Sequence, residues 1–358
     1  MPVPSLVALS VHGARGASGG TLRSVGRPLY FSHSACLEHE TGEHPERPAR
    51  IEAIEAELER RGWLGYERRE APAAPLDAVT AVHPATHVEA VSSMSASRGS
   101  LDGETVLSPG SYRAALHAAG GACAMVDALL AGEARAAFCA TRPPGHHARS
   151  DATSGFCLFN NVAVAARLAL DSLGVRRVFI FDWDVHHGDG TNDIFRTSDA
   201  VLFASIHQSD LFPGTGPLHD AGSRAGEGFS INLPVPAGAG EDAWLSLLEH
   251  IVVPAALEFR PDLVLISAGY DAHRDDVQGS CELEAGSYAE MARHVRALGA
   301  EVGAPVGAVL EGGYALDALA ASVAATLEAL AGDEPPAMVA PDFLTARAAS
   351  YIGHYWTL

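Results

Sequence analysis

Two short segments rich in histidine and aspartate are the strongest candidates for chemistry in this chain. Residues 142–148 read Arg-Pro-Pro-Gly-His-His-Ala and place His146 beside His147. Residues 182–190 read Asp-Trp-Asp-Val-His-His-Gly-Asp-Gly. A metal ion that activates water needs oxygen and nitrogen ligands on rigid elements, with a proton-carrying group beside an open coordination position. The two segments supply both kinds of group, so the sequence predicts metal-assisted hydrolysis.

Asp184, His186 and Asp271 are the candidate metal ligands. Asp184 and His186 lie two residues apart after an apolar run, so on an extended chain both side chains project to the same side. Asp271 follows a second apolar run and Gly269, which allows a close approach of the backbone. Two carboxylates and one imidazole leave a position free for water. This donor set fits Zn²⁺ best and leaves Fe²⁺ and Co²⁺ open, because ligand type restricts the metal without fixing it.

The elements that must position these residues alternate along the chain. Five apolar runs are predicted to be strands, at residues 136–140, 177–181, 201–205, 263–267 and 306–310. Longer amphipathic stretches are predicted to be helices, at residues 46–61, 111–131, 161–173, 241–259, 285–302 and 316–330. The alternation favours one α/β domain with a mostly parallel sheet and helices on both faces. Because ligands bind beyond the carboxyl ends of such strands, we expect the polar segments that follow the strands to meet there.

Composition excludes several functions. The net charge of −20 disfavours nucleic-acid binding, which depends on basic neutralisation of phosphates. All 24 Lys and Arg residues are arginine, so a Walker-type phosphate loop, a Schiff-base enzyme and a Ser-Lys dyad are excluded. No apolar run approaches the roughly 20 residues needed to cross a bilayer, so we expect no membrane partner. The five cysteines form no CxxC pair, which predicts reduced thiols in a cytoplasmic protein.

The two ends of the chain and the connection at residues 70–84 show weaker patterns from which to predict structure. Residues 1–28 contain glycine and serine without a secretory-signal layout, so we expect a mobile N-terminal extension before a domain spanning residues 29–358. Residues 70–84 read as a proline-containing connection. The C-terminal segment, residues 332–358, carries Tyr351, Tyr355 and Trp356 and packs either on the domain or on a partner.

Seven motifs occur in order, at residues 44–50, 142–148, 155–157, 182–191, 212–216, 268–271 and 311–314. With them, residues 30–330 resemble the histone deacetylase superfamily, especially its class II-like and bacterial deacetylase-like amidohydrolase members, and more distantly the acetylpolyamine amidohydrolases. The resemblance implies a single-domain arginase/deacetylase-like fold. It also implies zinc-dependent hydrolysis of acyl amides of lysine or a similar primary amine to the free amine and acetate.

The resemblance further implies roles for the matched residues. Asp184, His186 and Asp271 would bind the catalytic metal. His146 and His147 would contact the water that the metal activates, and the second histidine would act as general base and then as general acid. Supporting carboxylates fix an imidazole's tautomer and basicity, and this role would fall to Asp182 for His146 and to Asp189 for His147. A structural K⁺ ion would be held by Asp182, Asp184, His186, Ser205 and Ile206.

The substrate pocket is also implied by resemblance. Tyr314 would donate its hydroxyl to the substrate carbonyl, where one such donor is worth roughly 10²–10³ in rate. Phe156 and Phe212 would flank a narrow acyl-amine tunnel, with Gly155 leaving room for the chain and Cys157 lining the wall. Gln278 would lie at the rim. Two arginines, Arg50 and Arg142, either line an inner cavity that releases acetate or cap carbonyls.

Other functions remain open at this point. An acetylpolyamine or other small-amide hydrolase is disfavoured, because Gln278 stands where polyamine-selective relatives carry glutamate. However, His273, Asp275 and Asp276 could equally form a rim that attracts cations. A non-catalytic protein that binds acyl amines is the more distant alternative, and an arginase-like two-metal site lacks enough matched ligands. Homodimers and tetramers both remain open.

Overall fold

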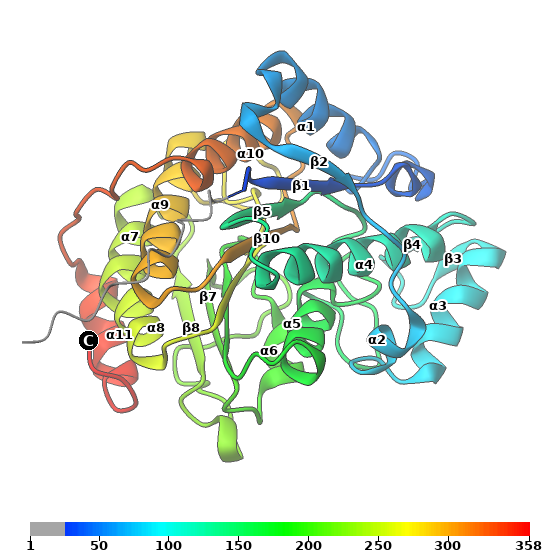
Figure 1. Ribbon diagram of the computed structural model, residues 1–358. Coiled ribbons are helices and arrows are strands. Elements are labelled where there is room, and N and C mark those ends of the chain that lie inside the picture. The colour runs from blue at the N-terminus through cyan, green and yellow to red at the C-terminus, as the bar shows by residue number, and fades with distance from the viewer. Residues whose placement is uncertain (1–25) are drawn as a thin grey trace, which may run out of the picture.

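An eight-stranded sheet crosses the molecule, with helices on both faces (Figure 1). The structure is a computed structural model that describes residues 26–358. The strand order is β2-β1-β5-β10-β9-β6-β7-β8, and every neighbouring pair is parallel. The strands are β1 (Leu29–Ser32), β2 (Glu67–Glu70), β5 (Ala136–Cys139), β6 (Val178–Asp182), β7 (Val201–Gln208), β8 (Ser230–Val235), β9 (Leu263–Ala268) and β10 (Val306–Leu310). The mostly parallel α/β sheet predicted from the sequence is confirmed.

The five predicted strands form the interior of this sheet because both of their faces are buried. In β6, Phe179 and Phe181 belong to one core, while Val178 and Ile180 belong to the core on the other face. A strand covered on both faces reads as a continuous apolar run, and that pattern is what made these strands visible in the sequence. Three further strands, β1, β2 and β8, were not predicted. β2 is an edge strand, and its sequence Glu-Arg-Arg-Glu carries no apolar pattern.

One face of the sheet is covered by α1, α7, α8, α9, α10 and α11, and the other by α2 to α6 (Figure 1). Helices that match the predictions to within a few residues are α1 (Ala49–Arg60), α4 (Ser111–Leu130), α5 (Asn161–Ser172), α9 (Ala285–Val302) and α10 (Leu316–Ala331). The predicted start of the first helix at residue 46 is too early. The residue before a proline avoids helical angles, so α1 begins only after Pro48.

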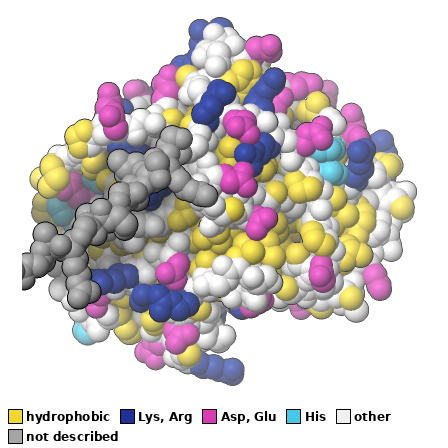
Figure 2. Space-filling view, in the orientation of Figure 1, with side chains coloured by type: hydrophobic (Ala, Val, Ile, Leu, Met, Phe, Trp, Pro, Cys, Tyr) yellow, Lys and Arg dark blue, Asp and Glu magenta, His cyan; other side chains and the backbone are white. Residues whose placement is uncertain are grey.

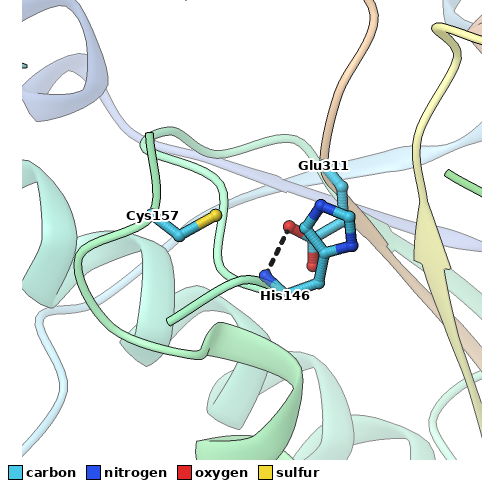
Figure 3. Close-up of side chains that lie close together, drawn as sticks. All are labelled: His146, Cys157 and Glu311. Atoms are coloured by element: carbon cyan, nitrogen blue, oxygen red, sulfur yellow. Dashed lines mark hydrogen bonds between the residues drawn. The ribbon is translucent and has the colours of Figure 1, made fainter. Parts of the chain in front are cut away.

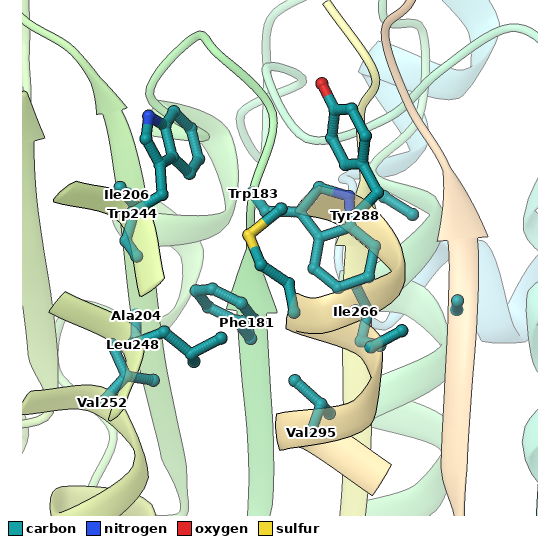
Figure 4. Packing of buried hydrophobic residues seen from close by; sticks show 14 of the residues in the cluster. Phe181, Trp183, Ala204, Ile206, Trp244, Leu248, Val252, Ile266, Tyr288 and Val295 are labelled. Atoms are coloured by element: carbon teal, nitrogen blue, oxygen red, sulfur yellow. The ribbon is translucent and has the colours of Figure 1, made fainter. Parts of the chain in front are cut away.

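The predicted helix 241–259 divides into three parts. They are α7 (Glu241–Leu247), a π-helical turn (Leu248–Val252) and α8 (Val253–Phe259). Pro254 lies in the first turn of α8 and has no amide hydrogen to donate to the preceding turn. Side chains from this helical run and from α9 pack against Phe181 and Trp183, which lie at the end of β6 (Figure 4).

One expectation about a connection is wrong, and the structure shows where the C-terminal segment packs. Residues 70–84 are not merely a connection, because they contain α2 (Leu76–Thr80), which leads into α3 (Ala85–Ser97). Other unpredicted elements are β3 (Gly99–Ser100), β4 (Val106–Leu107), α6 (Asp189–Phe195) and α11 (Phe343–Ile352). The C-terminal segment packs on the domain: α11 contacts α7 and β8, and the Trp356 indole donates to Gly228 O.

Most of the expected N-terminal extension, residues 1–25, lies outside the described residues. Within residues 26–358, every helix is too short or too polar to cross a bilayer. All five cysteines are buried, and none forms a disulfide within the described residues.

Candidate active site

The segments that follow four central strands meet at the carboxyl edge of the sheet. They bring together His146 and His147 after β5, Asp184 and His186 after β6, Asp271 after β9, and Tyr314 after β10. The register aligns these ends, since Asp182 pairs with Ser267 across β6 and β9. His207 lies within β7, where its ring forms hydrogen bonds with Ser205 and with Gly216 O.

Asp184, His186 and Asp271 form one buried group of potential ligands. Their ligand atoms all lie within 4.8 Å of one another. His186 Nδ1 is 3.0 Å from Asp184 Oδ1 and 3.2 Å from Asp271 Oδ2. Asp271 Oδ2 is buried and receives no hydrogen bond within the described part of the chain. A buried carboxylate oxygen without a donor, beside a second carboxylate and an imidazole, fits a divalent cation.

Glycines make this close packing feasible. A Cβ atom on Gly269 would lie 2.0 Å from Asp184 Oδ2, and one on Gly312 would lie 2.1 Å from Asp271 Oδ2. Real Cβ atoms do not approach carboxylate oxygens this closely, so both positions require glycine. The glycines of the motifs at 268–271 and 311–314 therefore let three loops pack around the ligand group.

The ligand group concentrates negative charge away from water. Burial and the neighbouring Asp184 raise the pKa of Asp271 to about 6. Burial would lower the pKa of His186, but the hydrogen bond to Asp184 and the nearby Asp271 carboxylate outweigh it and raise that pKa to about 10. The shift of His186, and the contribution of Asp184 to the shift of Asp271, reflect excess negative charge, which a bound cation would neutralise.

The histidine pair lies beside this group, and each ring is held by its own carboxylate. His146 Nδ1 is 3.0 Å from Asp182 Oδ2, and His147 Nδ1 is 2.8 Å from Asp189 Oδ1. The two ring centroids are 4.0 Å apart, and His146 Nε2 is 3.8 Å from an Asp184 oxygen. The pairing of histidines with aspartates implied by the family resemblance is therefore present in the structure.

The two histidines have opposite pKa shifts. Burial favours the neutral ring in both, but the charges of Asp184 and Asp182 override it and raise the pKa of His146 well above its usual value. Burial and the charge of His146 lower the pKa of His147 to about 4. Neighbouring groups whose pKa values are driven apart can serve as a proton acceptor and a charged partner.

Glu311 is a site residue to which the sequence assigned no role. Its Oε2 accepts hydrogen bonds from the backbone N–H groups of Gly145, at 2.6 Å, and His146, at 3.0 Å. Figure 3 shows its carboxylate beside the His146 ring, with Cys157 nearby. Burial raises the pKa of the Cys157 thiol well above its usual value, so this sulfur stays protonated. Through its two hydrogen bonds to backbone N–H groups, Glu311 holds the loop that carries His146 and His147 in place.

Tyr314 lies next to this loop with its ring between Phe156 and Arg50. The Phe156 and Tyr314 centroids are 5.9 Å apart, and the Arg50 guanidinium lies 4.9 Å from the Tyr314 centroid. Burial raises the pKa of Tyr314 well above 10, so the phenol keeps its proton and can donate a hydrogen bond. Arg50 donates to Gly313 O, and Arg142 donates to carbonyls and to a carboxylate, so both arginines cap oxygens.

Two of the predicted tunnel residues, Phe212 and Gly155, lie beside His147. The Phe212 ring centroid is 5.1 Å from that of His147, and its side chain is 40% exposed. A Cβ on Gly155 would lie 2.2 Å from His147 Cδ2 and 3.0 Å from Phe212. Gln278 lies on the loop after β9, where its N–H donates to Asp276.

Of the predicted potassium ligands, Ser205 is the register partner of Asp182, and both are buried. Ile206, the next residue of β7, is buried as well. A K⁺ ion at this position remains a prediction.

Comparison with known proteins identifies relatives along most of the chain. Residues 44–330 match the family model described as "Histone deacetylase domain". Histone deacetylase 14, chloroplastic, of Arabidopsis thaliana is 38% identical over 326 residues, which cover 86% of this chain and 77% of that protein. The histone deacetylase-like amidohydrolase of Pseudomonas aeruginosa is 37% identical over 310 residues, covering 80% and 82%. The crystal structure of the HDA15 HD domain has a TM-score of 0.86 and 33% identity, and the match covers 93% of this chain and 96% of that one. This likeness confirms the predicted deacetylase-like fold.

Proposed function

The chain belongs to the histone deacetylase family and is a hydrolytic deacetylase, and from this premise we propose that it cleaves acetyl and related acyl amides of lysine or a similar primary amine in a Zn²⁺-dependent reaction. The observation that carries the proposal is the group of Asp184, His186 and Asp271 beside a carboxylate-supported histidine pair. Fe²⁺ or Co²⁺ can replace Zn²⁺ at a site with these ligands.

Asp184, His186 and Asp271 would hold the cation. A divalent ion there supplies a Lewis acid for the acyl carbonyl and lowers the pKa of a water molecule. Tyr314 donates its phenol O–H to the carbonyl oxygen, which becomes negative as the water attacks. Phe156, Phe212 and Gly155 line the approach and exclude bulk water from the acyl group.

Protons are moved by the histidine pair. His147, whose low pKa keeps it neutral, accepts a proton from the attacking water while its Nδ1–H stays bonded to Asp189. His146, held by Asp182, carries positive charge beside the developing negative charge. Collapse of the tetrahedral intermediate breaks the C–N bond. His147 then gives its proton to the departing nitrogen, which leaves a free amine and acetate.

Some details of the proposal rest on sequence alone. Gln278, in place of a rim glutamate, favours acyl-lysine over acetylpolyamines. Two further proposals are a structural K⁺ ion held by Asp182, Asp184, His186, Ser205 and Ile206, and a cytoplasmic location.

A turnover comparison tests the substrate class. The Zn²⁺-loaded protein should hydrolyse acetyl-lysine peptides with a higher kcat/KM than N-acetylated polyamines, measured by acetate release. Higher turnover of the polyamines would replace the proposal with the small-amide hydrolase. No turnover of any acyl amine by protein with one bound metal per chain would instead favour a binding protein. The variant Asp271→Asn should lose both bound metal and turnover.

A further inference from the structure

Asp276 is buried, whereas its neighbour Asp275 is exposed. The Asp276 side chain lies on the loop after β9 and is only 7% exposed. Its Oδ2 accepts hydrogen bonds from the N–H groups of Tyr314, at 2.6 Å, and Ala315, at 2.9 Å. Its Oδ1 accepts from Gln278 N–H at 3.0 Å. The expectation that Asp275 and Asp276 form a cation-attracting rim is therefore wrong for Asp276, whose carboxylate is directed at backbone donors.

These bonds cap a helix from a distant loop. Helix α10 begins at Leu316, and its N-cap residue, Ala315, has no side chain that can accept from the first free N–H groups. Such groups need an acceptor, and a carboxylate also interacts favourably with the positive end of the helix dipole. The Asp276 carboxylate accepts from the N–H of Ala315, the N-cap residue, and from the N–H of Tyr314 just before the helix, so its charge lies at the positive end of the helix dipole. This cap is formed by a residue 39 positions away in the sequence.

The cap matters because the segment leading to Tyr314 contains two consecutive glycines, whose backbone angles are little restricted by side chains. Gly312 and Gly313 precede it, and Gly313 adopts φ of 111°, a conformation that other residues rarely reach. Arg50 holds this segment on its N-terminal side through Gly313 O. Asp276 holds it on the C-terminal side through the N–H groups that follow. The peptide group between Gly313 and Tyr314 is therefore held at its carbonyl by the Arg50 guanidinium and at its N–H by the Asp276 carboxylate.

We propose that Asp276 is a positioning residue for the reaction, which fixes the Tyr314 phenol at the substrate carbonyl and links it to the loop that carries Val277 and Gln278. Val277 is 82% exposed, so this loop presents a side chain to solvent immediately beside the buried cap. A substrate that contacts the loop would act on Tyr314 through two hydrogen bonds. The inference rests on the proposed function, because it concerns the group that polarises the acyl carbonyl.

Three variants test the role, with Asp275→Asn as the matched control because the Asp275 side chain is 71% exposed on the same loop. Asp276→Ala should lower kcat by about 10- to 100-fold, because small misplacement of a catalytic group has effects of this size. KM should change by less than about threefold, since the carboxylate does not contact substrate. Asp276→Asn keeps an acceptor oxygen and should fall between. Asp275→Asn should keep the kcat of the unmodified chain, because an exposed rim charge that attracts a cationic substrate would change KM and not kcat.

A double variant that combines Asp276→Ala with Tyr314→Phe distinguishes a positioning role from a general loss of structure. If Asp276 acts through the phenol, Asp276→Ala should reduce kcat by less than about twofold in the Tyr314→Phe background. Multiplicative losses, or a change confined to KM, would overturn the proposal. Bound metal and the unfolding midpoint are measured for every variant, and Asp276→Asn carries the test if Asp276→Ala does not fold.

Amide hydrogen exchange gives a readout that does not need turnover. The Tyr314 and Ala315 amides should exchange faster in Asp276→Asn than in Asp275→Asn, and equal rates would contradict the clamp. An unmodified chain that shows no turnover refutes the proposed function. If the unmodified chain turns over substrate and the Asp276→Asn variant has the same kcat and the same amide exchange rates, only the positioning role is refuted.

Discussion

At the scale of single residues, the site depends on contacts too close for an added methyl group. Gly155 has φ of 52°, and a Cβ there would lie 2.2 Å from His147 Cδ2. Gly155 belongs to the motif at residues 155–157, and the family resemblance implied that it leaves room for the substrate chain. The structure adds that the glycine also leaves room for the His147 ring.

Gly155→Ala should therefore reduce kcat by at least about tenfold, because His147 must move and small displacements cost about this much. The matched control is Gly132→Ala. Gly132 also has positive φ, at 75°, but no atom lies within 4 Å of its added Cβ. Both variants should lose about 1–3 kcal/mol of unfolding free energy from backbone strain. Equal activity of the two variants in a steady-state assay would contradict the steric argument.

Ligand-type residues could be predicted from the sequence, but the groups that hold them could not. Asp184, His186 and Asp271 were predicted because their side-chain chemistry and spacing after strands restrict their role. Glu311 and Asp276 act by accepting hydrogen bonds from backbone N–H groups of distant loops. Backbone donors carry no residue-specific signature, so no spacing pattern reveals such partners.

At the scale of elements, a buried ion pair joins the loop before α1 to the loop after β5. Arg142 Nε and Nη2 donate to the two Glu46 oxygens, each at 2.6 Å, and both side chains are almost fully buried. Burial opposes the charge on Glu46, but Arg142 overrides it and lowers the pKa of the Glu46 carboxyl. The loop with the histidine pair begins at this arginine.

Arg142→Met should cost about 3–5 kcal/mol of unfolding free energy, because the buried Glu46 carboxylate loses its bidentate partner and keeps only Arg50 Nη1, at 3.4 Å, as a guanidinium partner. Adding Glu46→Leu should recover part of that loss by removing the stranded charge. Urea unfolding of both single variants and the double variant measures the coupling. Simple additivity of the two single effects would show that the pair does not act as a unit.

A second connection between elements is sensitive to pH. His83 follows α2, and its Nδ1 donates to Ser150 O while its Nε2 accepts from Asn160 N–H. This bonding requires the neutral ring, and burial, with a smaller contribution from His87, lowers the pKa of His83 to about 4. Asn160 in turn caps α5. Protonation of His83 would therefore loosen the loop that follows the histidine pair.

The direction in which stability changes with pH follows from the pKa of His83 in the unfolded chain, 6.5, and in the folded chain, about 4. Between pH 6.5 and about 4 the unfolded chain binds a proton at His83 that the folded chain does not, so stability is complete above 6.5 and falls as the pH decreases. His83→Gln keeps a donor and an acceptor but does not titrate. Its unfolding free energy should depend less steeply on pH in this window, by up to about 1.4 kcal/mol per pH unit. Identical slopes would show that His83 titrates normally in the folded state.

Burial on both faces determined which strands could be predicted from the sequence. The central strands β6, β9 and β10 are covered on both faces and read as apolar runs. β2 lies at an edge and is charged throughout, so only pairing with β1 defines it. The short helix α2 follows Pro75 and was hidden in a proline-containing stretch.

At the scale of the whole molecule, surface charge is consistent with a small or peptidic substrate. Figure 2 shows arginines scattered among acidic side chains on the visible face rather than gathered in a stripe. With a net charge of −20, this face offers no basic track for a phosphate backbone. A group of charged side chains that includes Asp184 and Asp271 is buried at the carboxyl edge of the sheet.

That buried charge should couple metal binding to global stability. Asp184 and Asp271 follow β6 and β9, the neighbouring central strands, so a shared cation would join the middle of the sheet at one end. Without it, Asp271 Oδ2 has no donor among residues 26–358, and the carboxylates repel. A ligand that binds only the folded chain stabilises it by about 1.4 kcal/mol for each tenfold rise in its free concentration above Kd.

The unfolding free energy, measured by urea titration in buffered Zn²⁺, should rise with this slope and should fall when a chelator removes the ion. Asp271→Asn should flatten the dependence, whereas Asp275→Asn, on the exposed part of the same loop, should retain it. A flat dependence in the unmodified chain would mean that the three side chains do not share a cation. The metal-dependent mechanism would then fail, even though the fold and the histidine pair would remain intact.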